Sequence, residues 1–243
     1  MLNLHLEMEK LVLLSWMMEC RQHWSMLRDV EIVMLNGLMP WGNTHLFPRG
    51  SLREPLEALC RADIIVVHHA DLVPDRNLTI IESKLHLLNA SCIVFFSSLA
   101  PSHFFEVKNQ HSKLPLSSVC NRVVLCVSAI GFPDAFIQTV GKIGPSHVDR
   151  LDFGDHHFIQ IYDIEMIKRR ICELKDRFNE EVIAVVTEKD YNRDPFILKE
   201  LHNFDVFILC STFQIMPLKG RSEEIFRTKL KELIIAKYGR MIT

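Results

Sequence analysis

One carboxylate and two imidazoles stand side by side in the stretch Gly154-Asp155-His156-His157-Phe158. Side chains of these types accept and donate protons near neutral pH, and they also ligate metal ions. The preceding glycine permits a tight turn, so a polar turn without chemistry is the simplest alternative. The residue types therefore leave three interpretations open: one half of a proton-transfer pair, part of a metal site, or a structural turn.

Two further polar clusters each follow an apolar run. Thr187-Glu188-Lys189-Asp190 follows Val182–Val186, and His68-His69, with Asp71 just beyond, ends another run. Thr187 and Glu188 would also suit a helix start, as N-cap and as a negative charge near the helix dipole. The two histidines and Asp71 could join His156 as zinc or iron ligands, but no short ligand spacing supports this. We therefore assign no metal site.

Elements of two kinds must position these clusters. Helical spacing of apolar residues is present at 163–178 and at 222–238, where Ser222 and two acids form a typical helix start. Strands alternating with helices predict an α/β fold with a doubly wound, mostly parallel sheet. Short β-branched, aromatic or aliphatic runs, typical of buried parallel strands, lie at 30–35, 63–67, 92–96, 123–127, 182–186 and 206–209.

The predicted sheet also indicates where the chemistry lies. Ligands of such sheets bind at the carboxyl ends of the strands. Asp155 and its two histidine neighbours follow the strand-like run His147–Phe153 through Gly154. We therefore expect the three polar clusters to lie on one rim of the sheet, where they can converge on a single site. The expected linker is Asn109–Ser118.

Bulk properties exclude several classes of function. The 243 residues carry a formal net charge of −2 without a basic block interleaved with aromatics, so nucleic acid is not an expected partner. The seven cysteines include no C-x-x-C pair, which indicates structural thiols in a reducing compartment. No apolar run approaches the roughly 20 residues of a membrane span. Glu7 and Glu9 lie where a targeting segment would be basic, so none is recognised in this chain.

Four motifs together resemble a known family. They are PRGSLREPLEAL at 48–59, VSAIGFPDAF at 127–136, GDHHF at 154–158 and VVTEKD at 185–190. In this order and spacing they resemble the tetraacyldisaccharide 4′-kinases, also called lipid A 4′-kinases. Four motifs in register are far more specific than any one alone. With residues 28–50 the resemblance runs from about Gln22 to the C-terminus, and it looks like the plant version of the family.

The resemblance implies a P-loop kinase fold with two α/β domains. It implies transfer of the γ-phosphate of ATP, with Mg²⁺, to the 4′-hydroxyl of an acylated glucosamine disaccharide 1-phosphate, a lipid A precursor. The family is associated with the membrane surface through an N-terminal segment, and the plant version is mitochondrial.

The resemblance also assigns roles to single residues. In the family, the first histidine of the DHH motif pairs with an aspartate of an Asp-Asp-Gly motif to accept the hydroxyl proton. The resemblance therefore makes His156 and its neighbour Asp155 the expected catalytic residues. Asn43 is expected to position its loop, whereas His68 and His69 stand where bacterial members commonly have asparagine and glycine. For Arg53 and Glu54 the alternative role is helix capping. The resemblance implies contacts with substrate or nucleotide for Arg49, Arg53, Glu54, Asp71, His157, Glu188, Lys189 and Asp190.

Two family motifs are absent from the 243 residues. No stretch reads G-x-x-x-x-G-K-[ST], the loop whose backbone amides hold phosphates. Asp-Asp-Gly should stand just before Gln22, where the chain reads SWMMECR at 15–21. We therefore interpret 22–118 as the remainder of the N-terminal kinase domain without its phosphate-loop portion and 119–243 as a C-terminal α/β domain. The chain as written is expected to be inactive.

The genetic code offers a reason for the second absence. Trp16-Met17-Met18-Glu19 is encoded by TGG ATG ATG followed by GAA or GAG. Reading one nucleotide back gives GAT GAT GGA, which encodes Asp-Asp-Gly. We therefore hypothesise that residues 1–21 are an out-of-frame N-terminus.

Two functions of other classes remain open from the residues alone. The chain could be a non-catalytic lipid-binding or regulatory module that keeps the disaccharide-binding surface. It could also be a metal-dependent phosphoesterase that uses Asp155, His156 and His157.

Overall fold

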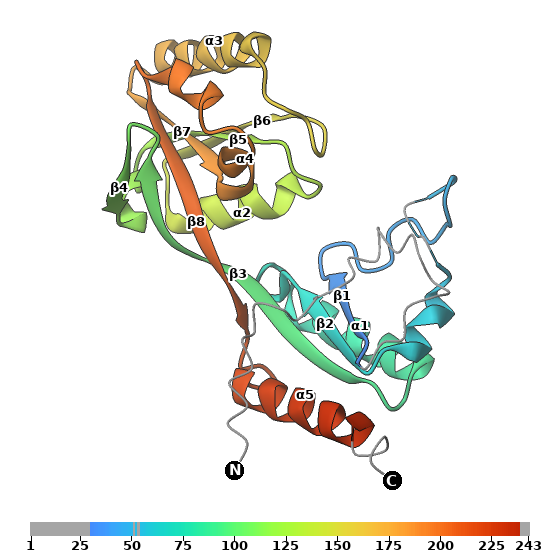
Figure 1. Cartoon of the computed structure of the whole chain (residues 1–243). Helices are drawn as coiled ribbons and strands as arrows, with labels where there is room; N and C mark the ends of the chain where they lie inside the picture. The colour runs from blue at the N-terminus through green and yellow to red at the C-terminus, as the bar shows by residue number, and fades with distance from the viewer. Residues whose placement is uncertain (1–29, 51, 53, 239–243) are drawn as a thin grey trace. The chain divides into compact units, whose positions relative to one another are not determined.

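The computed structural model describes residues 30–50, 52 and 54–238, and the chain divides into two compact units. Unit 1 contains residues 30–98 and 214–238, and unit 2 contains residues 99–213. Two long strands, β3 (Ile93–Glu106) and β8 (Asp205–Ile215), each begin in one unit and end in the other (Figure 1). Unit 2 is therefore one continuous segment, whereas unit 1 is built from two separate parts of the chain.

Unit 1 contains a parallel sheet in which β2 lies between β1 and the first part of β3. The register places Asn36 beside His68, and His68 beside Ser97, so three polar residues end this part of the sheet. The other elements of unit 1 are β1 (Ile32–Asn36), β2 (Ile64–His68), α1 (Asp75–Leu88), α5 (Glu223–Tyr238) and the 3-10 helices η2 (Leu56–Arg61) and η3 (Ala70–Leu72).

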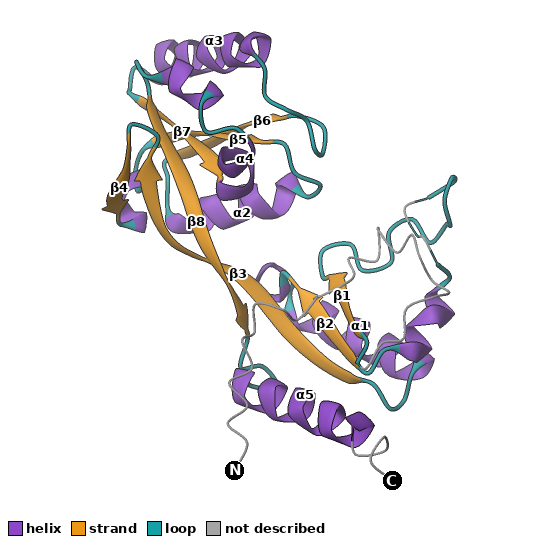
Figure 2. Cartoon of the chain, in the orientation of Figure 1, coloured by secondary structure: helices purple, strands orange, loops and turns teal. Residues whose placement is uncertain are grey.

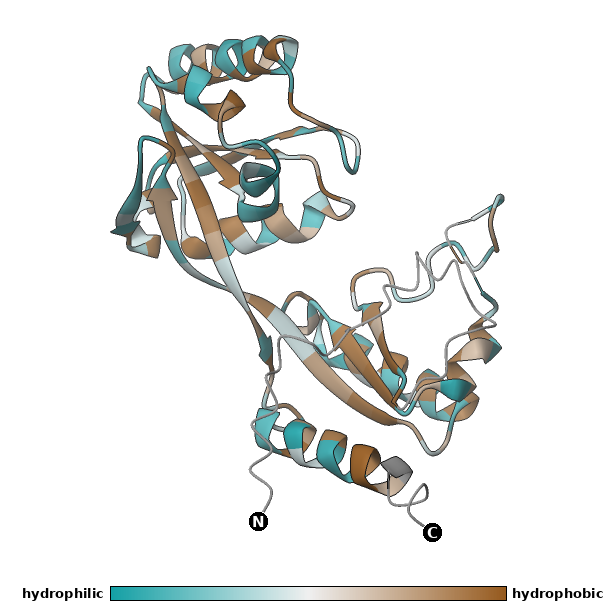
Figure 3. Ribbon diagram, viewed as in Figure 1, coloured by the Kyte–Doolittle hydropathy of each residue, from teal (hydrophilic) through white to brown (hydrophobic). Residues whose placement is uncertain are grey.

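Alternation along the strands of unit 1 creates two buried faces. Ile65 and Val67 of β2 pack on the face that also buries Leu78 and Leu85 of α1, whereas Ile64 and Val66 face the side covered by α5. Successive side chains of a strand point to opposite faces, so a strand that is apolar throughout needs a helix on each side. Figure 3 shows this continuous apolar character along β2.

Unit 2 repeats this arrangement with more strands. β5 pairs with β6 and β7, and β7 pairs with β8, all in parallel, while β4 pairs with β3 in antiparallel fashion. Its other elements are β4 (Asn109–Leu114), η4 (Leu116–Val119), β5 (Val123–Ser128), α2 (Pro133–Ile143), β6 (His147–Asp152), α3 (Ile161–Phe178), β7 (Val182–Thr187), α4 (Glu188–Arg193) and η5 (Ile197–Leu201).

Helices cover both faces of the unit 2 strands. Leu125 and Val127 of β5 pack with the apolar side of α3, whereas Val124 and Cys126 pack with Phe136 of α2. Figure 2 shows α2 and α3 on opposite sides of these strands. The carboxyl ends of β5, β6 and β7 lead into α2, the GDHHF turn and α4, respectively, so the sheet brings these segments to one edge.

The predicted fold class is confirmed: each unit is α/β, its strands are mostly parallel, and helices cover both faces. The predicted linker Asn109–Ser118 is wrong, because these residues form β4 and η4. The side chains of β4 are polar and largely exposed, and its backbone pairs with β3. An apolar pattern therefore does not indicate this strand. Within the described chain, no helix combines the length and the apolar character that crossing a membrane requires.

The compact units also differ from the domain boundary expected at residue 118. Val119 and Phe104, on either side of that boundary region, belong to one buried cluster with α2, so β4 and η4 fall in unit 2. Helix α5 returns to unit 1, where Leu230 packs against β2 and β3. The hypothesis on residues 1–21 lies outside the described residues.

Candidate active site

The GDHHF segment forms a tight turn after β6. The His157 N–H donates to the Gly154 carbonyl over 3.0 Å, and His156 has a left-handed backbone with φ 62°. A left-handed conformation is uncommon for a residue with a Cβ and persists where its surroundings determine it. The turn leaves the His156 side chain 65% exposed, so this imidazole is accessible to a substrate.

Asp155 lies where three of the four motifs meet. Its Oδ2 is 3.7 Å from His156 Nε2, and its Oδ1 is 3.7 Å from Lys189 Nζ. The same carboxylate packs against Gly131, where a Cβ would come within 3.1 Å of Oδ2. Gly131 belongs to VSAIGFPDAF and Lys189 to VVTEKD. Asp155 therefore joins the loops that follow β5, β6 and β7.

His157 points away from this meeting point into a partly buried pair. Its Nε2 is 2.7 Å from Asp163 Oδ2, and its ring stacks on Phe153 with centroids 5.2 Å apart. Asp163 also accepts the Gln160 N–H over 2.8 Å, as part of the capping box of α3. A carboxylate has no proton to donate, so His157 Nε2 must carry the hydrogen of this bond.

Asp190 is a buried anchor within the TEKD motif. Its side chain is 1% exposed, and its Oδ2 accepts the Ala129 N–H over 3.0 Å and the Thr187 hydroxyl over 2.7 Å. The Thr187 hydroxyl oxygen in turn accepts the Asp190 N–H, which confirms Thr187 as the N-cap of α4. Glu188 is exposed at the start of α4. Asp190 therefore links β5 to β7 and is not itself accessible.

The third polar cluster lies in unit 1, at the carboxyl ends of β1, β2 and β3. His68 Nδ1 is 3.0 Å from the buried Ser97 hydroxyl, and the buried Asn36 Nδ2 beside them finds no hydrogen-bond partner among the residues that the structure describes. Burial, with a smaller effect of His69, lowers the pKa of His68 to about 4. Burial also lowers the pKa of His69, whose backbone is left-handed, whereas Asp71 is exposed.

The LREP segment also belongs to unit 1. Asn43 donates to the Arg49 carbonyl over 3.1 Å and accepts the His45 N–H over 3.2 Å, so it does position its loop. Glu54 pairs with Arg61, and the Arg49 side chain is exposed. Arg53 lies outside the described residues.

The sequence profile described as "Tetraacyldisaccharide-1-P 4'-kinase" matches residues 19–232. The chain belongs to this family. It is 48% identical over 217 residues to "Probable tetraacyldisaccharide 4'-kinase, mitochondrial" from Arabidopsis thaliana, covering 89% of this chain and 55% of that protein. It is 32% identical over 199 residues to a tetraacyldisaccharide 4'-kinase from Halothermothrix orenii, covering 77% of this chain and 50% of the relative.

The chain thus spans about half the length of the curated tetraacyldisaccharide 4'-kinases that it matches. Among solved structures it is similar to a crystal structure of the "apo" form of LpxK from Aquifex aeolicus in complex with ATP. That comparison gives 18% sequence identity and a TM-score of 0.46, and it covers 86% of this chain and 53% of the other.

Two of the three predicted clusters come together in this kinase-family chain. Asp155 and Lys189 approach each other in unit 2, whereas His68, His69 and Asp71 belong to unit 1. Across the described residues, no group of three or more histidine, cysteine, aspartate or glutamate side chains could hold a metal ion.

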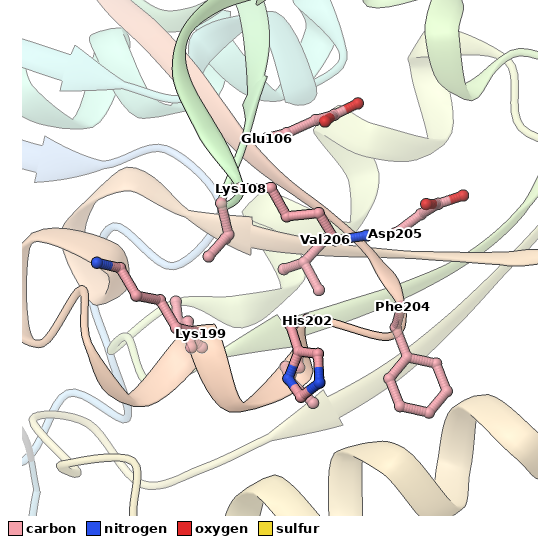
Figure 4. A pocket seen from close by; sticks show the side chains of 10 residues that line it. Glu106, Lys108, Lys199, His202, Phe204, Asp205 and Val206 are labelled. Carbon is pink, nitrogen blue, oxygen red and sulfur yellow. The ribbon is translucent and has the colours of Figure 1, made fainter.

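A pocket in unit 2 lies away from the kinase-family motifs. It has a volume of about 400 Å³ and is lined by the β3–β4 turn, η5 and the beginning of β8 (Figure 4). The beginning of β8 is the amino end of a parallel strand, opposite to the end that carries Asp155. Lys108, Lys199 and His202 lie among its lining residues, but the four family motifs contribute none.

Sequence reasoning missed the roles of three residues that support the tetraacyldisaccharide 4'-kinase motifs, one of which, Gly131, lies within a motif. Asp163 and Arg193 bind the GDHHF turn, and Gly131 leaves room for Asp155. The spacing of Gln160 and Asp163 is that of a capping box and could have indicated that Asp163 is held at a helix start. No local pattern indicates the contact of Arg193, because its partner is 36 residues away.

Proposed function

We propose that this chain contributes the carboxyl-end loops of unit 2 to a 4′-kinase reaction. In that reaction the γ-phosphate of ATP passes to the 4′-hydroxyl of an acylated glucosamine disaccharide 1-phosphate. The observation that carries the proposal is the meeting of Gly131, Asp155 and Lys189, which brings three family motifs together beside the exposed His156. Because the relatives are about twice as long, the full reaction belongs to the whole protein.

His156 serves as the proton-accepting group for the 4′-hydroxyl. Phosphoryl transfer depends mainly on positioning and charge stabilisation, and a base within reach of the hydroxyl supplies the remaining requirement. The His156 imidazole is exposed, and the Asp155 carboxylate lies 3.7 Å from its Nε2. An aspartate of the Asp-Asp-Gly motif would be its partner in the whole protein.

Lys189 supports the same step through charge. Its ammonium group lies 3.7 Å from Asp155 Oδ1 and remains half-exposed, so it can approach a phosphate. Glu188, which is exposed at the start of α4, is proposed as a further contact. His157, the other expected contact in this region, has its ring held by Asp163. In unit 1, Arg49, Arg53, Glu54 and Asp71 are proposed to contact substrate or nucleotide. Asp190, although it belongs to the same motif, acts by holding the loops.

Among the described residues no three histidine, cysteine, aspartate or glutamate side chains converge, and the Mg²⁺ of phosphoryl transfer is commonly held by one or two carboxylates together with the substrate phosphates. We assign none of the described residues to this ion. The 243 residues also contain no G-x-x-x-x-G-K-[ST] sequence. The chain as written is accordingly proposed to lack turnover, and unit 1 to be the remainder of a kinase domain. Membrane attachment through an N-terminal segment and a mitochondrial location, like that in the name of the Arabidopsis relative, belong to the same proposal.

The first experiment concerns the reading frame. Sequencing the locus and transcripts upstream of the Gln22 codon should reveal GATGATGGA in frame with a phosphate-loop exon. If no such frame exists, the out-of-frame hypothesis for residues 1–21 fails.

The second experiment measures phosphoryl transfer. The frame-restored protein is incubated with γ-labelled ATP, Mg²⁺ and tetraacyldisaccharide 1-phosphate, alongside the 243-residue chain. We expect transfer only by the restored protein, and we expect His156→Ala to lower kcat about 10²- to 10⁴-fold. The exposed His111 gives a matched control, His111→Ala, which should retain wild-type kcat.

Three results would contradict the proposal in different ways. Transfer by the 243-residue chain would overturn its inactivity. Equal kcat values for His156→Ala and His111→Ala would overturn the role of His156. Disaccharide binding without transfer by the restored protein would favour the lipid-binding module instead.

A further inference from the structure

The side chain of His156 makes few contacts that could fix the position of its imidazole. Its side chain is largely exposed, and its distance of 3.7 Å to Asp155 exceeds that of a hydrogen bond. Its backbone nevertheless keeps a φ of 62°. A non-glycine residue stays in this region only when neighbouring contacts determine its backbone. The position of the imidazole therefore depends on what holds the next residue, His157.

His157 is fixed at every polar group of its backbone and by its ring. Its N–H donates to Gly154, its Nε2 donates to Asp163, and its carbonyl accepts Arg193 Nη1 over 2.9 Å. The ring also stacks on Phe153 at an interplanar angle of 13°. These contacts fix the peptide that follows His156 and hence the direction in which His156 leaves the turn.

The donor to the His157 carbonyl is itself anchored. The Arg193 side chain is 15% exposed, and its Nη1 lies 3.4 Å from Asp190 Oδ1. Asp190 is held by the Ala129 N–H at the end of β5 and by the Thr187 hydroxyl at the end of β7. A continuous series of polar contacts therefore runs from two core strands, through Asp190 and Arg193, to the turn that carries His156.

We propose that Arg193 is a positioning residue for His156, with Asp190 as its anchor and Asp163 as the residue that fixes the Nε2–H tautomer of His157. This inference rests on the proposed role of His156. None of the three side chains needs to touch the substrate. Arg193 acts through the His157 carbonyl, and Asp163 acts through the His157 ring.

Histidine-labelled protein tests the inference without ATP or lipid. Long-range ¹H–¹⁵N spectra of the 243-residue chain report the ring tautomers, and amide exchange reports the His157 N–H. We expect Arg193→Met to speed exchange of the His157 amide about tenfold and to shift the His156 signals. Arg177→Met is the matched control, because the Arg177 side chain is exposed and lies over the Phe178 ring. The exposed His111 on β4 is the internal reference.

A second pair of variants separates position from charge. Asp163→Ala removes the acceptor and should give His157 a mixture of tautomers. Asp163→Asn keeps an acceptor oxygen without the charge and should preserve the Nε2–H form. Should Arg193→Met not fold, Arg193→Gln, which retains an amide donor, takes its place in the same exchange measurement.

Unchanged His156 and His157 signals in folded Arg193 and Asp163→Ala variants would overturn the inference. In the frame-restored protein, Arg193→Met should lower kcat about a hundredfold with KM unchanged, since misplacement of a catalytic group by about 1 Å has an effect of this size. If the turn is ordered as expected but kcat does not depend on His156, the proposed function fails. The inference about how Arg193 positions the turn would still hold.

Discussion

At the scale of single residues, burial decides the protonation state of His68. His68 is the last residue of β2, and its side chain is buried in unit 1. Its neighbours in the sheet are Asn36 on β1 and Ser97 on β3. Burial, and to a smaller extent His69, lower its pKa to about 4. The imidazole is therefore neutral at pH 7 and works as a hydrogen-bonding group. It contrasts with His156, which lies exposed to solvent.

The lowered pKa of His68 makes stability depend on pH. Between pH 4 and pH 6.5, His68 is protonated in the unfolded chain but neutral in the folded chain. Acidification through this range therefore favours unfolding. From this group alone we expect the free energy of unfolding to fall by about 2 kcal/mol between pH 8 and pH 5.

Urea unfolding at the two pH values measures this effect. His68→Gln should remove the corresponding part of the pH dependence, whereas His111→Gln, on the exposed strand β4, should leave it in place. An identical pH dependence in wild type and His68→Gln would show that the ring is not protonated on unfolding.

At the scale of elements, apolar periodicity predicts the cores but not the edges. Runs such as Val123–Val127 and Val182–Val186 were recognisable because strands buried on both faces are apolar throughout. The polar β4 was missed because it pairs with β3 through its backbone and exposes most side chains. The second half of β3, from Leu99 to Glu106, was missed for the same reason of mixed polarity.

The candidate site was predictable only in part, for a related reason. The motif residues Asp155 and Lys189 could be assigned to one sheet edge because both follow parallel strands. The contacts of Asp163 and Arg193 depend on how the Gly154 turn closes, and side-chain reach across a turn leaves no periodic signal in the sequence. Sequence reasoning therefore predicted that these two segments lie at one sheet edge, but it did not predict the residues that support them.

The start of α4 offers a test at this scale. Thr187 caps the helix and also donates to the buried Asp190, so Thr187→Ala removes a cap and leaves a buried carboxylate with one partner fewer. We expect the free energy of unfolding to fall by about 1 to 2 kcal/mol. Thr228→Ala, in the exposed part of α5, should change it by less than about 0.5 kcal/mol. Similar losses for both variants would contradict the structural role of the Thr187 hydroxyl.

At the scale of the whole molecule, unit 1 is completed by the end of the chain. Glu82 of α1 accepts hydrogen bonds from Lys219 and Arg221, which belong to the returning segment. Burial raises the pKa of Glu82, but these hydrogen bonds outweigh it, so the net shift is downward. The ion pairs therefore stabilise the unit above pH 4.5, and this contribution is lost as the pH falls through the lower folded-state pKa.

Replacing this carboxylate tests how firmly the two parts of unit 1 are joined. Glu82→Gln should lower the free energy of unfolding at pH 7 by about 1 to 3 kcal/mol, because it leaves two cations without their partly buried partner. Glu223→Gln breaks an exposed pair with Arg227 on α5 and should cost less than about 0.5 kcal/mol. Chemical denaturation compares the two, and a Glu82→Gln loss no larger than that of Glu223→Gln would refute the expectation.

Unit 2 should also fold without unit 1. Two of the hydrophobic clusters lie entirely within residues 99–213, and neither uses a residue of unit 1. The isolated segment 99–213 should therefore unfold cooperatively and show the same His157 tautomer as the full chain. Gradual unfolding, with exposed apolar surface detected by dye binding, would mean that unit 2 needs the rest of the chain.

The passage of β3 and β8 between the units also bears on synthesis at the ribosome. The strands β1, β2 and β3 are translated before most of unit 2, and α5, which covers Ile64 and Val66, is translated after it. Most of unit 2 is translated in between, which takes roughly ten seconds at about 5 to 20 residues per second. During that time α5 does not yet cover this apolar face of the nascent sheet, and the face is a surface on which a chaperone would act.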